Sequence, residues 1–478
     1  MDAPKPHHPQ ALPFLFLTEM WERFGFYVVQ GLLVLYMTQY FGFSDNESYT
    51  ILGVFTALVY ISPILGGLLA DKVLGFKTAI VWGGLFLVLG YLLLSLPYPH
   101  MLFYPALATI IVGNGLFKPN ISSLLGTQYT PDDPRRDAGF TIFYIGINIG
   151  ALLAGLSSGY IKNYFGWRTS FSLASIGLLI GLATFAFGLH TIKHKKSHPL
   201  SNKLKYQFLF CAILAIIGLD FLLKINALAN WLLPIVGVLL LVFLTVLTLQ
   251  QDPEYRKRLF VLNILIISSV VFWMLFLQLF FSANLFVDRL VDKNFLGIPL
   301  TTTVFYASES IFIILLGPIF AWSWQALGRN NQNPSPISKF VLGIFCAGIG
   351  FLTLAISTLF PNASGFIPAA WVFLAYLFIT IGELLLSPIG LSAVTLLAPT
   401  HLVGMIMGIW FVATGFGGIF AGAIAKMASV PDTVTTTTEK LAIYQDAFLN
   451  FAYLAFIVAI LLFFIQLALR KFLRGVNS

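Results

Sequence analysis

Apolar stretches of about 20 residues recur along the whole of this chain, and they constrain its fold more than any other feature of the sequence. A helix of about that length crosses the hydrocarbon core of a bilayer, which is about 30 Å thick. Of the 478 residues, 58% are hydrophobic and only 10% are charged, whereas soluble domains carry roughly a quarter charged residues. The composition therefore excludes a soluble domain and predicts an all-α membrane protein.

Charge clusters, prolines and glycines divide the chain into about fourteen predicted transmembrane helices. The first six are expected at 13–40, 48–74, 77–96, 100–123, 136–163 and 168–189. Two more follow a lysine-rich segment, at 204–223 and 229–250. The last six are expected at 258–289, 301–326, 337–359, 367–397, 401–427 and 444–470. This order predicts an N-terminal six-helix bundle, a linker with two extra helices and a C-terminal six-helix bundle, at 1–192, 193–256 and 257–478.

The orientation is predicted from the basic residues, which gather in alternate loops. Lys and Arg are enriched in cytoplasmic loops of membrane proteins, so this asymmetry explains the formal net charge of +8 without a nucleic-acid partner. It predicts a multi-pass protein of the cell inner membrane with both termini in the cytoplasm. The cytoplasmic residues then include Lys193, Lys195, Lys196, Arg470, Lys471 and Arg474. The polar segment Met1–Gln10 precedes no small-residue cleavage site, so we expect the first helix to be retained.

Several charged residues lie inside predicted spans, where one charge costs about 2.5 to 3.5 kcal/mol on insertion scales. On the first helix, Glu19, Glu22 and Arg23 are spaced i, i+3 and i+4, which brings them to one face. Tyr27 continues that face four residues after Arg23. Further charges interrupt later spans, namely Lys118, Glu309 and Glu383. Such residues point to a binding site or a proton pathway, although ion pairs that only fix helix packing are an alternative.

The signs of these charges differ between the two predicted bundles. Arg23 and Lys118 in the first are positive, whereas Glu309 and Glu383 in the second are negative. A zwitterion would fit between them, with its carboxylate at Arg23 and Lys118 and its ammonium group at Glu383. Two bundles that close alternately around such a ligand would form a solute transporter.

These residues stand in segments that resemble the proton-dependent oligopeptide transporter (POT) family of the major facilitator superfamily. Glu19–Phe24 is similar to the family's ExxERF motif, and Phe140–Ala151 resembles its fifth-helix signature. Lys118–Ser122 and Glu383–Ser392 are similar to further motifs. The resemblance implies a major facilitator fold with two extra helices between the bundles. It also implies symport of di- and tripeptides, with protons as the coupling ion and no cofactor.

The resemblance assigns roles residue by residue. The substrate-binding residues it implies are Arg23, Tyr27, Tyr60, Lys118, Asn148 and Glu383, to which we add Glu309, Ser387 and Trp410. The proton-coupling residues it implies are Glu19, Glu22, Arg23, Lys118 and Glu383.

Four positions depart from the family pattern. Phe26 replaces a usual tyrosine, Gln30 stands where many members have arginine, and Leu277 stands where they have a coupling glutamate. The arginine and the glutamate can pair as an external gate, so their joint loss avoids an unpaired buried charge. Glu309 occupies a position where asparagine is usual. We hypothesise that it provides a compensating proton site or a preference for ligands with additional positive charge.

Other functions are weighed against peptide transport. A carrier for another amine-bearing or zwitterionic solute, with altered coupling, is one alternative, and a transporter-like sensor is another. An enzyme is not expected, because the chain has no GxxxxGK or HExxH motif. Cys211 and Cys346 fall inside predicted spans, so we expect neither a disulfide framework nor a CxxC metal site. The predicted partners are a peptide and the bilayer, and a monomer is expected to be functional.

Overall fold

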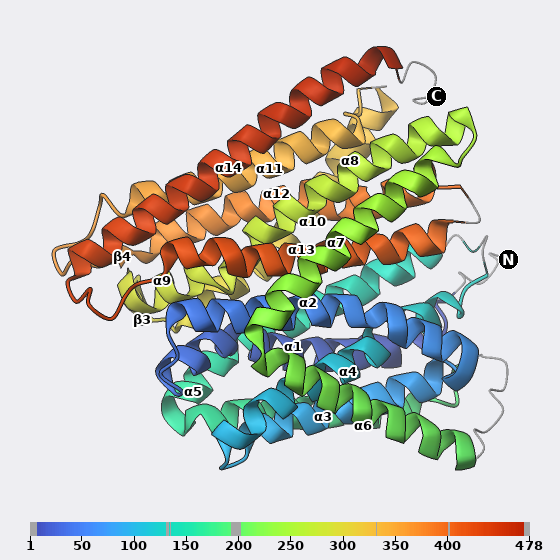
Figure 1. The fold of residues 1–478 in the computed structure, drawn as a ribbon, viewed down its shortest axis with the longest axis horizontal. Coiled ribbons are helices and arrows are strands. Elements are labelled where there is room, and N and C mark those ends of the chain that lie inside the picture. The colour runs from blue at the N-terminus through green and yellow to red at the C-terminus, as the bar shows by residue number, and fades with distance from the viewer. Residues whose placement is uncertain are drawn as a thin grey trace, which may run out of the picture. The chain divides into compact units, whose positions relative to one another are not determined.

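The computed structural model is almost entirely helical and describes residues 7–130, 133, 135–192, 202–330, 332–399 and 402–472 (Figure 1). Its first helices are α1 (Leu12–Gln39), α2 (Asp45–Leu69), the π-helix η1 (Ala70–Leu74), α3 (Phe76–Ser95), α4 (Pro99–Gly126) and α5 (Arg136–Gly188). The two extra helices are α6 (Asn202–Lys224) and α7 (Asn226–Leu249). The remaining helices are α8 (Pro253–Phe276), η2 (Leu277–Leu279), α9 (Ser282–Leu290), α10 (Thr302–Arg329), α11 (Pro336–Ser357), α12 (Ala369–Leu397), α13 (Val403–Ala425), η3 (Lys426–Ala428) and α14 (Thr437–Phe472).

Each predicted span falls on these helices, although several are divided differently. The span expected at 48–74 comprises α2 and η1, and that expected at 401–427 comprises α13 and η3. The spans expected at 136–163 and 168–189 are both within α5, which Gly166 interrupts with a φ of +83°. Only glycine adopts such a conformation without strain, so this residue marks the turn between them. The span expected at 258–289 is divided into α8, η2 and α9.

Eleven helical segments in the described residues are long and apolar enough to cross a membrane, with α5 taken as one segment. Helix α1 is not among them, and its charged residues Glu19, Glu22 and Arg23 lower its hydropathy. Helix α7 contributes a shorter apolar stretch, Ile235–Leu249. The basic residues used to predict orientation lie largely outside the described residues, in 193–201 and 473–478, and the side chains of Arg470 and Lys471 are likewise not described.

The helices form two compact units. The first comprises Met1–Leu32 and Leu58–Ile225, and the second comprises Leu33–Ala57 and Asn226–Ser478. The end of α1 and the beginning of α2 thus belong to the second unit. The division into three parts at residues 192 and 256 stays a prediction.

Glycines allow very close helix packing in the first unit. Helix α4 packs against α3 and α6 (Figure 1). A Cβ atom on Gly66 of α2 would lie 1.9 Å from the carbonyl oxygen of Gly115 in α4, and one on Gly83 of α3 would lie 2.6 Å from the backbone nitrogen of Phe117. Any side chain at these glycines would push α2 or α3 away from α4, so the residues of α4 are held in fixed positions.

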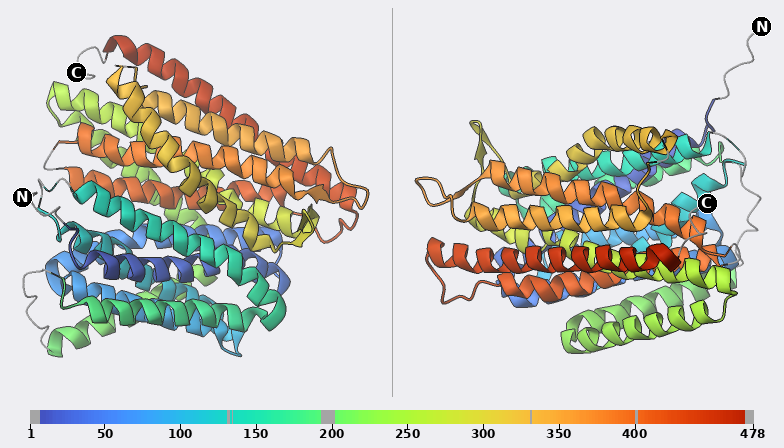
Figure 2. Two further views of the ribbon diagram at one scale, coloured as in Figure 1. Left: turned by 180° about the vertical axis from the view of Figure 1, so that it is seen from behind. Right: turned by 90° about the horizontal axis from the view of Figure 1, so that it is seen from above.

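In the second unit, α11 packs against both α12 and α14, and these helices run side by side in Figure 2. Two small strand pairs lie at the ends of helices. Strand β1 (Val291–Asp292) pairs in parallel with β4 (Ile367–Pro368), and β2 (Asn294–Phe295) pairs antiparallel with β3 (Ile298–Pro299). The β1–β4 pair joins the end of α9 to the beginning of α12, the helix that carries Glu383.

Candidate functional site

The charged residues of α1 form a buried ion-pair cluster in the first unit. The Nε atom of Arg23 donates to Oε2 of Glu22 over 2.5 Å, and its Nη2 atom donates to Oε1 of the same residue over 2.7 Å. Oε1 of Glu19 lies 3.5 Å from Nε of Arg23. All three residues are at most 3% exposed. Both acids contact one guanidinium group, which balances much of the charge that burial would otherwise penalise.

Asn114 of α4 connects this cluster to the turn of α2 that contains Pro63, and it was not predicted as a site residue. Pro63 lies inside α2 and has no backbone N–H, so the carbonyl of Val59 loses its helical donor. The Nδ2 atom of Asn114 donates to that carbonyl over 2.8 Å. Its Oδ1 atom accepts from Nη2 of Arg23 over 3.3 Å. The sequence feature that could have indicated a role for Asn114 is its polar amide, which lies between Gly113 and Gly115 in an apolar span.

Lys118 lies one turn further along α4. Its Nζ atom is 4.5 Å from the centre of the Tyr60 ring, which is a cation–π contact. It also interacts electrostatically with Arg23, Glu22 and Glu19. Among the described residues of the first unit, no carboxylate lies within 4 Å of Nζ. Within the described part of this unit, the ammonium group is therefore close to the ion-pair cluster without a direct contact to a carboxylate.

Two other predicted binding residues lie on helices of this unit. Tyr27 is half-buried on α1, one turn after Arg23, and interacts with it electrostatically. Asn148 is 5% exposed on α5, and its Nδ2 atom donates to the carbonyl of Tyr144 over 3.0 Å. The structure thus brings Arg23, Tyr27, Lys118 and Tyr60 into one neighbourhood, whereas the amide of Asn148 bonds within its own helix.

The second unit holds a pair of buried acids. Glu309 of α10 and Glu383 of α12 are each 8% exposed, and their carboxyl groups lie within hydrogen-bonding reach of each other. Ser310 donates to Oε2 of Glu309 over 3.3 Å. Within the described residues of this unit, neither acid has a basic partner, and Oε2 of Glu383 is buried without a hydrogen-bond partner. Two carboxyl groups can share a hydrogen bond only when one of them carries a proton.

Ser387 and Trp410 lie on α12 and α13 in the same unit. Ser387 is half-buried one turn after Glu383 and directly before Pro388. Trp410 is 3% exposed, and its ring packs so closely against Gly390 that a Cβ atom there would lie 2.0 Å from it. The ring also makes an edge contact with Phe340 at 6.1 Å between centroids. Burial of Trp410 favours a packing contact between α11, α12 and α13.

A bidentate ion pair at the beginning of α2 was not predicted from the sequence. The two guanidinium nitrogens of Arg289 in α9 donate to the two carboxylate oxygens of Asp45, each over 2.7 Å. The backbone N–H of Val430 also donates to Asp45, over 3.0 Å. Asp45 is only 4% exposed. These contacts join the beginning of α2 to α9 and to the segment before α14, and no local sequence pattern relates the three.

A sequence profile of the POT family matches residues 77–441, more than half of the chain. The chain belongs to the POT family. Two bacterial relatives of this chain are dipeptide and tripeptide permease A of Proteus mirabilis and dipeptide and tripeptide permease B of Xenorhabdus bovienii. The first is 35% identical over 97% of this chain and 95% of the relative, and the second is 35% identical over 99% and 97%.

Solved structures of POT-family transporters have the same fold. A tetrameric crystal form of PepTSo2 is 29% identical and superposes with a TM-score of 0.86 over 98% of this chain and 99% of that chain. A mutant peptide transporter POT in complex with alafosfalin is 31% identical, with a TM-score of 0.84 over 97% and 96%. The predicted major facilitator fold is therefore confirmed. So is the prediction of a membrane transporter rather than an enzyme, and the apolar helices make it a multi-pass inner-membrane protein.

The positions that depart from the POT-family pattern are buried. Phe26 is 4% exposed, and the guanidinium group of Arg23 lies 4.7 Å from the centre of its ring. A tyrosine there would add a hydroxyl group, whereas phenylalanine offers only its π-face. Gln30 and Leu277 are each 3% exposed, in α1 and η2. Gln30 is uncharged and Leu277 is apolar, so neither side chain can take up or release a proton.

Proposed function

We propose that this POT-family protein imports di- and tripeptides by alternating access, in symport with protons. The relatives at 35% identity are named dipeptide and tripeptide permeases, and they match nearly the full chain. The observation that carries the coupling is the Glu309–Glu383 pair, which is buried with no basic partner in its described unit. A proton must reside on this pair whenever the two carboxyl groups hydrogen-bond.

The acid pair would couple the peptide amine to the proton. An incoming ammonium group can take the place of the shared proton, because it donates hydrogen bonds to both carboxylates and neutralises their charge. Conversely, the empty site needs a proton to return without two adjacent negative charges. In this mechanism Glu309 takes the proton-coupling role of the glutamate that the family usually has at the position of Leu277. Glu383 is the amine-binding residue, with Ser387 and Trp410 forming the nearby wall.

The first unit would bind the peptide carboxylate. Lys118 has no carboxylate within 4 Å among the described residues of this unit, whereas Arg23 is already bound by Glu22. A peptide carboxylate that contacts both cations competes with Glu22 and Glu19 for the guanidinium group. Protonation of one of these acids would release Arg23 for the peptide, which makes this cluster a second place of coupling. Tyr27, Tyr60 and Asn148 would contact the peptide beside these charges.

The Asp45–Arg289 pair would form part of the external gate. With both termini in the cytoplasm, as we propose, α2 begins at the external side. To open that side, the ion pair and the Asp45–Val430 hydrogen bond must break. Exchanging the charges, with Asp45→Arg and Arg289→Asp together, should restore much of the transport that either single change removes. Uptake by the exchanged variant that is no better than by the single variants would contradict this role.

Uptake by reconstituted proteoliposomes tests the proposed function. We expect labelled dialanine to accumulate when an inward proton gradient is imposed and only to equilibrate without one. One coupled proton gives about tenfold accumulation per pH unit, since one pH unit is worth about 1.4 kcal/mol. Dialanine uptake that ignores the gradient would contradict proton coupling, and absence of dialanine uptake would contradict the substrate. We propose that one chain is sufficient, because it carries both charged clusters.

A second candidate substrate is another amine-bearing solute, and the second buried acid at Glu309 favours it. A polyamine or a modified peptide carries more positive charge than a simple dipeptide and would engage both acids. Competition against labelled dialanine by a panel of dipeptides and diamines distinguishes the two. Stronger competition by diamines than by any dipeptide would favour the second candidate.

A further inference from the structure

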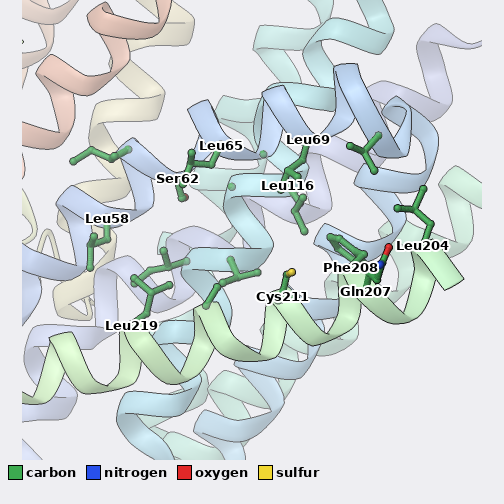
Figure 3. A pocket seen from close by; sticks show the side chains of 18 residues that line it. Leu58, Ser62, Leu65, Leu69, Leu116, Leu204, Gln207, Phe208, Cys211 and Leu219 are labelled. Atoms are coloured by element: carbon green, nitrogen blue, oxygen red, sulfur yellow. The ribbon is translucent and has the colours of Figure 1, made fainter. Parts of the chain in front are cut away.

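An apolar groove runs along α6 in the first unit, on the side that faces α2 and α4. Its volume is about 380 Å³. Figure 3 shows that Leu204, Phe208, Cys211 and Leu219 of α6 line one wall, while Leu65 and Leu116 stand opposite. Apolar side chains form almost the entire surface, with Ser62 and Gln207 as polar exceptions. In a bilayer such a groove is filled by something apolar.

The length of the groove suits an acyl chain. The lining residues of α6 extend from Leu204 to Leu219, which corresponds to about 22 Å at 1.5 Å per residue. One leaflet of the hydrocarbon core is about 15 Å thick, half of the whole core. One hydrocarbon chain of a lipid can therefore lie along the groove.

One end of the groove is rich in positive charge. The lining residues Gln207, Cys211, Ala215 and Leu219 follow one another at four-residue intervals, and Lys203 continues this stripe by one more turn. Lys203 and Lys205 are exposed on either side of Leu204, and Lys72 is exposed beside the lining residue Val73. Asp71 is the acid in this neighbourhood. At the far end, the only charges nearby in α6 are Asp220 and Lys224, which pair with each other over 2.7 Å.

A second groove provides an internal comparison. It lies between α7, α8 and α13, has a volume of about 420 Å³ and is lined only by apolar residues. Helix α7 contains no Lys or Arg. In α8, Arg258 lies eight residues before the first lining residue, Ile266, and pairs with Glu254 over 2.6 Å. The two grooves therefore offer similar space for a chain, but the groove along α6 has basic side chains directly beside its lining residues.

We propose that the groove along α6 binds an anionic phospholipid, with one acyl chain between α6 and α2 and the phosphate-containing headgroup at Lys203, Lys205 and Lys72. In the orientation proposed above, this lipid belongs to the cytoplasmic leaflet. The binding site itself does not depend on the transported substrate. The apolar wall holds the chain, and the lysines select the anionic headgroup.

Native mass spectrometry of the purified full-length protein tests the proposal with phosphatidylglycerol and phosphatidylcholine that carry the same acyl chains. The wild-type protein should retain phosphatidylglycerol preferentially. Each lysine near an anionic headgroup contributes a factor of about five in affinity, so Lys203→Gln with Lys205→Gln should weaken phosphatidylglycerol binding by about 25-fold. The same double substitution should leave the binding of phosphatidylcholine unchanged. Ala215→Phe, which fills the groove, should reduce binding of both lipids.

Two matched variants on α6 serve as controls. Leu214→Phe adds a ring beside Ala215 at a position that does not line the groove, and Lys224→Gln removes a lysine at the opposite end. Both should bind the two lipids as the wild type does. Equal retention of the two lipids by the wild type, or wild-type binding by Ala215→Phe, would overturn the proposal. Retention of a second protein copy instead of lipid would assign the groove to an interface and overturn it as well.

Cys211 provides a measurement that requires no change in the groove. It is exposed and lines the middle of the wall, while the other cysteine is removed by Cys346→Ser. Phosphatidylglycerol should slow alkylation of Cys211 by N-ethylmaleimide about fivefold relative to the same concentration of phosphatidylcholine. Equal rates in the two lipids would contradict headgroup selection.

Discussion

The two units solve the problem of buried charge in different ways. In the first, Arg23 contacts Glu22 and Glu19, so acids and a base largely neutralise one another. In the second, Glu309 and Glu383 have each other and Ser310 as polar partners, and no basic partner, among the described residues of that unit. A buried ion pair can keep its charges until another anion competes for the base, whereas two adjacent acids must bind a proton or a cation. The first unit is therefore suited to receive an anion at its base and the second to receive a proton or a cation.

The largest effect is expected from Arg23→Gln, because it leaves two buried acids without their base. Breaking such a pair costs about 3 to 5 kcal/mol, so thermal unfolding in detergent should occur at a clearly lower temperature and dialanine uptake should be lost. Lys118→Gln is the control, since it leaves the ion pairs intact. It should lose uptake while it unfolds at nearly the wild-type temperature. An Arg23→Gln protein as stable as the wild type would show that the ion pairs are not what holds this unit together.

The next effect is expected from Glu383→Gln in the second unit. The amide can still hydrogen-bond to Glu309, so the protein should stay folded, but the pair can no longer exchange a proton for an ammonium group. Accumulation of dialanine against its gradient should fall from about tenfold per pH unit to none. Exchange of external for internal dipeptide, which needs no net proton movement, should continue. If Glu383→Gln accumulated dialanine as the wild type does, the acid pair of the second unit would not be the site of proton exchange.

A smaller effect is expected from Glu309→Asn, which restores the amide usual in the family. If Glu309 contributes a charged hydrogen bond to a second positive group, affinity for lysine-containing dipeptides should fall roughly tenfold, whereas neutral dipeptides should bind as before. Competition against labelled dialanine at several pH values measures both. Unchanged selectivity together with an unchanged pH profile would exclude the selective and the proton-carrying role of Glu309.

The smallest effect is expected from Asp133→Asn, in the loop between α4 and α5. A hydrogen bond from the Arg135 side chain lowers the pKa of Asp133 from 3.8 to about 2. A lowered pKa stabilises the folded state above the ordinary pKa, and this contribution disappears only as the pH falls through the folded-state value. Between pH 5 and 8 the carboxylate stays charged in either state. The pH profile of uptake should therefore be unchanged, and a shifted profile would mean that exposed loop charges contribute to coupling.

The helices could be predicted from the sequence because length and hydropathy alone define a span. The helix expected at 337–359 is found at Pro336–Ser357, and that expected at 77–96 at Phe76–Ser95. The i, i+3, i+4 spacing likewise predicted that Glu19, Glu22 and Arg23 share a face. Contacts between distant segments were not predictable in this way. Asp45 and Arg289 are 244 residues apart, and only the tertiary fold brings them together.

In the candidate site, too, single residues could be predicted from the sequence, whereas contacts between helices could not. A charge inside an apolar span is visible in the sequence, so Lys118, Glu309 and Glu383 could be selected without a structure. The role of Asn114 could not, because it depends on a carbonyl group that Pro63 frees in another helix. The sequence also gave no sign that the carboxyl groups of Glu309 and Glu383 approach each other, since they lie on α10 and α12.

The two hydrogen bonds of Asn114 have a mechanical consequence. One end of this amide bonds to the Val59 carbonyl of α2 and the other to the guanidinium group of Arg23. If the curvature of α2 changes at Pro63, the Val59 carbonyl moves, and the amide must either follow it or release it. A change in the curvature of α2 can thus change the position of the Arg23 guanidinium group on α1 through the single side chain of Asn114.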